Sequence, residues 1–233
     1  MNAHSVRFLG LLLTAGLLVP GCASRQPPPL SATWEKDIRA FEAADRKMPP
    51  PRGAVLFVGS SSIRLWHTLP ADFSDYPVIQ RGFGGCQMND VLAVVNRIVV
   101  PHAPRAIFVY AGDNDLANGR KPAEIGADFR QFARLVHRQL PQTHVAFIAI
   151  KPSPQRKALL GLAAEANQGI ARDCRRHSWL GYVDVFTPML DENSRPRPDL
   201  FVEDGLHLNA AGYALWTGIV RRHLEGIDSA RPR

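Results

Sequence analysis

Two short segments, far apart in the chain, carry the residue types that acyl transfer requires. Asp204-Gly205-Leu206-His207 places a carboxylate three residues before an imidazole, so both side chains can lie on one side of a tight turn. Far upstream, Gly59-Ser60-Ser61-Ser62 follows the apolar run Ala54–Val58. A strand that ends in such a turn exposes a hydroxyl at the edge of a sheet. Together the two segments indicate a hydrolase with a serine nucleophile.

The chemistry of these side chains assigns each a role. A serine hydroxyl is a weak nucleophile until a base takes its proton. His207 is the candidate base, and Asp204 would hold its other ring nitrogen and stabilise the imidazolium that forms. The competing interpretation is that the serines only cap a helix and have no relation to the other two residues.

The elements that must position these residues alternate along the chain. Five apolar runs are predicted as strands: Ala54–Val58, Val78–Gln80, Ala106–Tyr110, His144–Ile150 and Tyr182–Val185. Five segments have helical periodicity: Trp34–Lys47, Asp90–Val99, Pro122–Leu140, Arg156–His177 and Ala210–Leu224. This alternation predicts an α/β fold, with a five-stranded, mostly parallel sheet between two helical layers, a three-layer αβα sandwich. Parallel strands would bring the polar segments that follow them to one edge, where ligands bind.

Four ordered blocks resemble the SGNH, or GDSL, hydrolase superfamily. They are Gly59-Ser60-Ser61, the glycine Gly85, Gly112-Asp113-Asn114-Asp115 and Asp204-Gly205-Leu206-His207. The first departs from the family pattern, because Ser60 stands where an aspartate usually precedes the nucleophile. The run Gly-Ser-Ser-Ser-Ile-Arg-Leu-Trp at 59–66 is similar to a subgroup of GDSL-type esterases. The resemblance covers roughly 34–224.

This resemblance implies a flavodoxin-like SGNH-hydrolase fold and a site that needs no cofactor. It selects Ser61, rather than the neighbouring hydroxyls, as the nucleophile beside His207 and Asp204. Serine esterases of this type work through an acyl-enzyme intermediate. Family members act on acetylated sugars, short acyl esters, thioesters or phospholipids, and the blocks do not distinguish among these substrates.

An acyl-transfer site also needs donors aimed at the oxyanion. Gly85 offers an unshielded backbone N–H, Asn114 offers a side-chain amide, and the Ser61 N–H is a third candidate. The alternatives are a flexible turn at the glycine and an Asx turn at the asparagine. We expect no metal, because no histidine lies at ligand spacing beside Asp113 and Asp115. Asp115 is predicted to be a structural hydrogen-bonding residue, and the role of Asp113 stays open.

The N-terminal segment has the pattern of an export signal. The apolar run Phe8–Val19 follows Arg7 and is too short to span a bilayer. It ends in Val19-Pro20-Gly21-Cys22, which resembles a bacterial lipobox, so Cys22 is the predicted lipid attachment site. The alternative is an ordinary secretory signal with an incidental cysteine. The predicted organisation is a signal peptide (1–21), a lipidated Pro-rich tether (22–33), a hydrolase domain (34–226) and a tail (227–233).

Charge and cysteine content narrow the range of partners. The formal net charge of +7 falls to +6 without the signal peptide, with 27 basic and 21 acidic residues. The basic residues are scattered, which argues against nucleic-acid binding. Cys86 and Cys174 are predicted to be free thiols, the second on the buried face of a helix. The segment from Lys151 to Arg156 borders the expected cleft or forms a plain loop.

These patterns predict a serine esterase of the bacterial cell envelope, periplasm-facing and anchored to the membrane through its N-terminal lipid. Its expected substrates are short acyl esters or acetylated glycan esters, as small molecules or polymers. One alternative is a lipoprotein that binds glycan or lipid without turnover, for which the replacement of aspartate by Ser60 is the main argument. Another is an O-acyltransferase with the same three residues. Oligomeric state is not predicted.

Overall fold

Five parallel strands form the centre of the molecule. The computed structural model describes Met1 and residues 29–230. The strands are β1 (Val55–Gly59), β2 (Val78–Gly82), β3 (Ala106–Tyr110), β4 (His144–Ile148) and β5 (Leu180–Val183), in the order β2-β1-β3-β4-β5. Every pairing is parallel. The predicted α/β class and the flavodoxin-like order are confirmed. The last strand lies two residues earlier than predicted.

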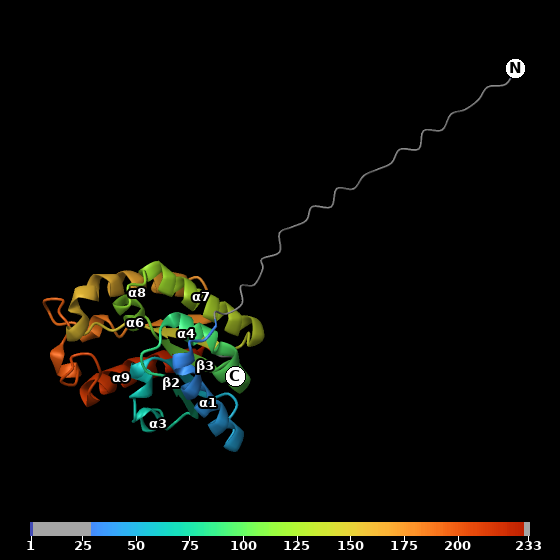
Figure 1. Ribbon diagram of the computed structural model, residues 1–233, viewed down its shortest axis with the longest axis horizontal. Helices are drawn as coiled ribbons and strands as arrows, with labels where there is room; N and C mark the ends of the chain where they lie inside the picture. The colour runs from blue at the N-terminus through green and yellow to red at the C-terminus, as the bar shows by residue number, and fades with distance from the viewer. Residues whose placement is uncertain (2–28, 231–233) are drawn as a thin grey trace.

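Helices cover both faces of the sheet, as the three-layer prediction requires (Figure 1). One face carries α1 (Ala32–Lys47), α4 (Met88–Ala93), α5 (Val95–Ile98), α7 (Pro122–Gln139) and α8 (Leu160–Cys174). The other carries α2 (Ser61–Arg64), α3 (Leu69–Asp72) and α9 (Ala210–Ser229). A short helix, α6 (Asp113–Ala117), follows β3, and 3₁₀ turns are η1 (Val100–His102), η2 (Pro154–Leu159), η3 (Thr187–Met189) and η4 (Pro198–Leu200).

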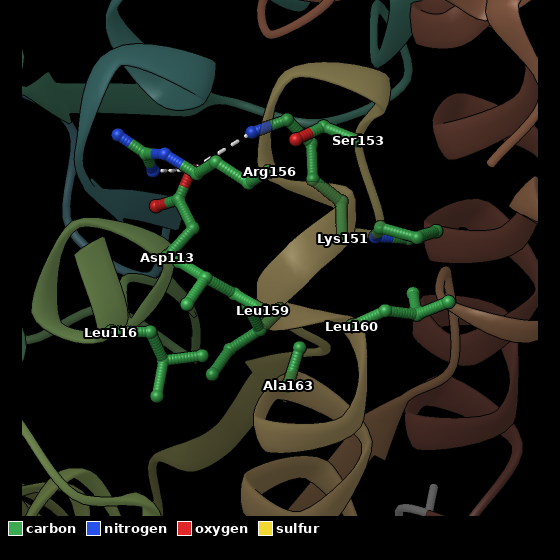
Figure 2. A pocket seen from close by; sticks show the side chains of 10 residues that line it. Asp113, Leu116, Lys151, Ser153, Arg156, Leu159, Leu160 and Ala163 are labelled. Atoms are coloured by element: carbon green, nitrogen blue, oxygen red, sulfur yellow. Dashed lines mark hydrogen bonds and ion pairs between the residues drawn. The ribbon is translucent and has the colours of Figure 1, made fainter.

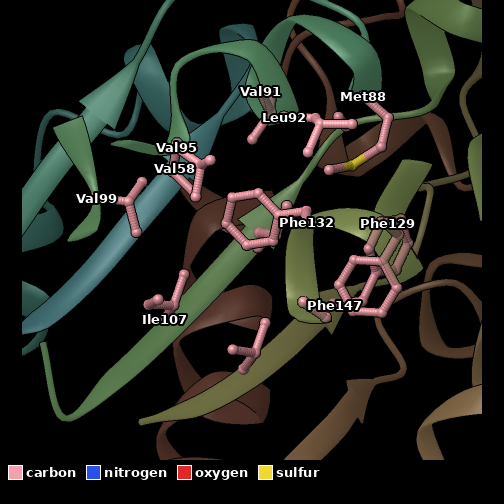
Figure 3. Packing of buried hydrophobic residues seen from close by; sticks show 14 of the residues in the cluster. Val58, Met88, Val91, Leu92, Val95, Val99, Ile107, Phe129, Phe132 and Phe147 are labelled. Carbon is pink, nitrogen blue, oxygen red and sulfur yellow. The ribbon is translucent and has the colours of Figure 1, made fainter. Parts of the chain in front are cut away.

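Alternation along the strands divides the apolar side chains between two cores. In β1, Leu56 and Val58 face the α7 side, whereas Val55 and Phe57 face α9. Figure 3 shows the α7-side core, in which Phe129 of α7 packs edge-on against Phe147 of β4 with ring centroids 4.9 Å apart. Because the central strands β1, β3 and β4 are buried on both faces, they are nearly continuous apolar runs, which is why the sequence identifies them.

Helix ends follow the local sequence signals. Ser31 caps α1, accepting a hydrogen bond from the Thr33 N–H. The helix starts at Ala32, so the last two residues of the expected tether (22–33) are helical. Pro122 opens α7, whose buried face includes Ile125, Phe129, Phe132 and Val136.

Three helical segments differ from their predictions. The helix expected over Asp90–Val99 is two helices that break at Val94, which has φ −99° and ψ 0°. The one expected over Arg156–His177 begins as η2, because Arg156 is non-helical with φ −112° and ψ 29°. The expected tail (227–233) begins inside α9, which continues to Ser229 since Asp228 bonds to Tyr76 and Arg105.

The predicted signal peptide (1–21) and the predicted lipidation site Cys22 fall almost wholly outside the described residues. Among helices of the described part, none combines the length and apolar character needed to cross a membrane. Cys86 and Cys174 are both buried and free, which confirms the predicted thiols. Burial raises the pKa of both, to about 12 for Cys174.

Candidate active site

The serine turn and the predicted oxyanion donors follow the carboxyl ends of three adjacent strands. Gly59, Gly82 and Tyr110 end β1, β2 and β3 and lie side by side in the sheet. Gly59 has φ +146°, and a side chain there would meet the Tyr110 carbonyl oxygen at 1.9 Å. Only glycine therefore allows the chain to turn so closely beside β3. Ser61 lies two residues after Gly59 and is the first residue of α2.

Ser61, His207 and Asp204 form a continuous set of polar contacts. The His207 Nε2 lies 3.1 Å from Ser61 Oγ, and its Nδ1 lies 2.6 Å from Asp204 Oδ2. The structure thus brings together the three side chains that the sequence places 146 and 3 residues apart. The Ser61 residue is 9% exposed, whereas the side chains of His207 and Asp204 are 30% and 46% exposed.

The turn at 204–207 explains the orientation of the carboxylate. Asp204 Oδ1 accepts hydrogen bonds from the backbone N–H groups of Leu206 and His207, each at 2.8 Å. Gly205 has φ +62°, the left-handed conformation that favours glycine. Burial acts to raise the pKa of Asp204, but these N–H groups and the His207 ring outweigh it and lower the pKa to about 2. The carboxylate is therefore ionised at any ordinary pH.

Helix α9 connects the histidine turn to the serine turn. Asn209 caps the helix, accepting from the Gly212 N–H at 3.0 Å and donating to the carbonyls of Asp199 and Phe201. One turn into the helix, the Tyr213 hydroxyl donates to the Ser62 carbonyl at 3.1 Å. The sequence analysis did not assign this role to Tyr213, which lies six residues after His207.

The predicted oxyanion donors follow neighbouring strands. Gly85 has φ +86°, and the Asn114 Nδ2 donates to the carbonyl of the adjacent Cys86 at 3.0 Å. An amide nitrogen carries two hydrogens, so one remains. Within residues 29–230, that second hydrogen and the N–H groups of Gly85 and Ser61 have no hydrogen-bond acceptor in the protein. Three donors on one edge of the sheet are thus available to a ligand.

Behind Asn114 lies a buried group of charges that the sequence analysis did not identify. Asp113 Oδ2 lies 3.0 Å from Lys151 Nζ and 3.0 Å from an Arg156 nitrogen, and Lys151 also contacts the Tyr110 hydroxyl at 3.0 Å. Arg156 in turn donates to Asn114 Oδ1 at 2.9 Å. Figure 2 shows Asp113, Arg156 and Lys151 at one end of a small cavity and Leu116 and Leu159 at the other.

The electrostatics of this group follow from its burial and pairing. Burial acts to raise the pKa of Asp113, but Lys151 and Arg156 outweigh it, so the pKa lies below its ordinary value. Burial acts to lower the pKa of Lys151, but Asp113 and Tyr110 outweigh it, so this pKa lies above its ordinary value. Burial raises the pKa of Tyr110 to about 12. Lys151 and Asp113 therefore both stay charged.

Other predicted residues have structural positions. Asp115 is fully buried, accepts from the Met88 N–H and pairs with Arg120 at 2.8 Å, which confirms its predicted structural role. The aromatic side chains Trp66 and Phe83 near the motifs are core residues without exposure. In the part of the chain that the structure describes, no group of three or more histidine, cysteine or acidic side chains is placed to hold a metal ion.

Comparison with known proteins agrees with this architecture. A GDSL-like lipase from Bacteroides thetaiotaomicron is 20% identical, with a TM-score of 0.69 over 81% of this chain and 97% of the other. A candidate platelet activating factor from Streptococcus pneumonia is 20% identical, with a TM-score of 0.75 over 82% and 92%. An acetylxylan esterase from Geobacillus stearothermophilus is 14% identical, with a TM-score of 0.61 over 80% and 100%.

At these identities the solved structures establish the shared fold. No curated protein sequence matches the chain. The model of the GDSL-like lipase/acylhydrolase family matches residues 56–215, which is more than half of the chain and includes Ser61, Gly85, Asn114, Asp204 and His207. The chain belongs to the GDSL-like lipase/acylhydrolase family.

Proposed function

We propose that this protein is a serine esterase that hydrolyses carboxylic esters through an acyl-enzyme on Ser61. The observation that carries the proposal is the set of contacts from Asp204 through His207 to the Ser61 hydroxyl. Membership of an acylhydrolase family supports the same reaction class. The free N–H groups of Gly85, Ser61 and Asn114 would bind the oxyanion as it develops.

The reaction follows from these contacts. Ser61 Oγ attacks the ester carbonyl carbon and passes its proton to His207 Nε2. The imidazolium, stabilised by Asp204, returns that proton to the alcohol oxygen as the carbon–oxygen bond breaks. A water molecule, deprotonated by His207, then attacks the acyl carbon. The proton goes back to Ser61 Oγ as the carboxylic acid leaves.

Short acyl groups, including acetyl groups on glycans, are the proposed substrates. The acetylxylan esterase from Geobacillus stearothermophilus supports this choice by the shared fold, and the export signal predicted from the sequence would place the enzyme among envelope glycans. We expect acetate release from acetylated xylo-oligosaccharides and a kcat/KM that falls from p-nitrophenyl acetate to p-nitrophenyl palmitate. A preference for the palmitate would overturn the short-acyl assignment.

Lipid attachment at Cys22 is proposed from Val19-Pro20-Gly21-Cys22 alone. Expression with an alkyne-tagged fatty acid should label the wild type, while Cys22→Ser should be unlabelled. Equal labelling of both proteins would exclude lipidation of this cysteine.

Turnover of p-nitrophenyl acetate tests the enzymatic proposal, and the serine turn offers a matched control. Ser61→Ala should lose activity by on the order of 10⁴-fold or more, since it removes the attacking oxygen. Ser60→Ala should retain activity within about threefold, because Ser60 Oγ is buried and makes no hydrogen bond among the described residues. Activity that survives in Ser61→Ala, or that never exceeds the buffer rate in the wild type, would overturn the proposal.

A further inference from the structure

The amide of Asn114 is held in one orientation by two contacts of opposite kind. Arg156 Nη2 lies 2.9 Å from one end of the amide, and a guanidinium has only donors, so that end is the carbonyl oxygen. The Cys86 carbonyl lies 3.0 Å from the other end and can only accept, so that end is the NH₂ group. Rotation of the amide by 180° would place like groups against each other at both contacts.

Fixing the amide in this way leaves one Nδ2 hydrogen for the oxyanion. A donor that already points at the developing charge needs no reorganisation during the reaction. The charge on Arg156 also polarises the amide, because hydrogen bonds in series strengthen one another. A cation at Oδ1 therefore makes the opposite N–H a stronger donor.

We infer that Arg156 is a positioning residue for the oxyanion donor Asn114 and that the buried Asp113 and Lys151 hold it in place. The inference rests on the proposed esterase function. It assigns a role to the charged cluster of Asp113, Lys151 and Arg156. From the sequence, the segment from Lys151 to Arg156 was interpreted as either the border of the cleft or a plain loop.

The backbone around Arg156 is tied to both halves of the site. Arg156 is the non-helical residue within η2. The Gln155 N–H donates to the Gly205 carbonyl at 3.0 Å, within the turn that carries Asp204 and His207. Arg156 Nη1 lies 3.0 Å from Asp113 Oδ2, which sits next to Asn114 in sequence. The guanidinium is thus fixed relative to the donor that it contacts.

The cluster carries a net positive charge. Lys151 and Arg156 share the single carboxylate of Asp113, and among the described residues neither pairs with another acid. One positive charge therefore remains uncompensated beside Asn114. In surroundings of low polarity, a fixed charge of this sign favours the negative charge of the transition state over the neutral ester.

The space around the cluster argues against a ligand site of its own. The adjoining cavity has a volume of about 10 Å³, roughly the room of one water molecule, and is lined mainly by apolar side chains such as Leu116 and Leu159. The Arg156 side chain is 20% exposed. A group that bound substrate directly would change KM when removed, whereas a group that acts through Asn114 should change kcat.

A double-mutant cycle on Arg156 and Asn114 tests the inference with p-nitrophenyl acetate. Arg156→Ala should lower kcat by roughly 10- to 100-fold, with KM within about twofold, because the lost interaction matters in the transition state. In an Asn114→Ala background the same change should cost less than about threefold, since the group it acts on is gone. Arg156→Lys should recover part of kcat, because lysine keeps a charged donor.

Two controls keep the result interpretable. Arg130→Ala removes an arginine in the middle of α7 that pairs with Asp173 at 2.6 Å, and it should leave kcat unchanged because neither residue contacts the site. If Arg156→Ala does not fold, Arg156→Gln, close in size but neutral, takes its place in the cycle. Independent, multiplicative losses in kcat, or a change confined to KM, would overturn the inference. Full activity in Ser61→Ala would instead overturn the proposed esterase function.

Discussion

The two halves of the candidate site differ in exposure and in how their polar groups are held. On the proton-transfer side, the His207 and Asp204 side chains are 30% and 46% exposed and contact Ser61 through a single hydrogen bond. On the oxyanion side, the Lys151 and Asp113 side chains are 1% and 7% exposed and form part of a connected ionic group. One half borders solvent and the other belongs to the interior.

This difference matches what each half must do in the proposed reaction. A general base exchanges protons with substrate and water, so it needs access to both. An oxyanion donor must be held in a fixed orientation, and buried charges that pair with one another provide that rigidity. The contrast predicts that substitutions on the proton-transfer side affect turnover alone, whereas substitutions on the oxyanion side affect both turnover and stability.

The largest expected effect is that of His207→Ala. Loss of the base should lower kcat by on the order of 10⁴- to 10⁶-fold, while the thermal midpoint shifts little because the ring is partly exposed. Steady-state kinetics and differential scanning calorimetry on the same sample measure both quantities. A large drop in the midpoint would remove the distinction between the two halves.

Lys151→Met probes the buried half. It leaves Asp113 in the interior with Arg156 as its remaining cation, which should lower the free energy of unfolding by about 3 kcal/mol. The matched control is Arg39→Met, whose pair with Glu35 lies on the surface and should cost much less free energy of unfolding than the buried pair. Urea unfolding followed by fluorescence compares the two variants. Equal stabilities would mean that the buried group contributes no more than a surface pair.

The acid side of the pH profile of kcat/KM should contain no contribution from Asp204. Asp204 has a pKa of about 2, below its usual value, so its contacts stabilise the fold above pH 4 or so and are lost only as pH falls through about 2. Because the Asp204 carboxylate stays ionised from pH 4 to 6, the slope of log kcat/KM against pH should not exceed one in that range. A slope of two would show that the carboxylate takes up a proton in the same range.

Much of the fold could be predicted because its signals are local. The central strands β1, β3 and β4 are buried on both faces, so each is a short apolar run, and Ser31 and Pro122 mark helix starts. The break at Val94 has no glycine or proline to reveal it. The end of α9 was missed because Asp228, a polar residue, is held in the helix by contacts with Tyr76 and Arg105 from elsewhere in the chain.

The site residues likewise divide into those that the sequence identifies and those that only the structure shows. Ser61, Asn114, Asp204 and His207 stand in blocks that the family resemblance identifies, and the structure places Ser61 beside His207. Arg156 stands in no such block, and its contact with Asn114 spans 42 residues. The sequence placed Lys151 in a segment that borders the cleft or forms a plain loop, and its burial could not be predicted, because an isolated lysine after a strand is ordinarily a surface residue. Pairing across the sheet edge is a property of the tertiary structure alone.

The most direct test of the account is to trap the acyl-enzyme. The protein would be mixed with p-nitrophenyl acetate, quenched in acid within milliseconds and digested for peptide mass spectrometry. We expect a burst of p-nitrophenol of one equivalent or less and an acetyl group on Ser61 that is absent from Ser61→Ala. Turnover without any acylated serine, or an acetyl group on a different residue that disappears as product forms, would contradict the central claim.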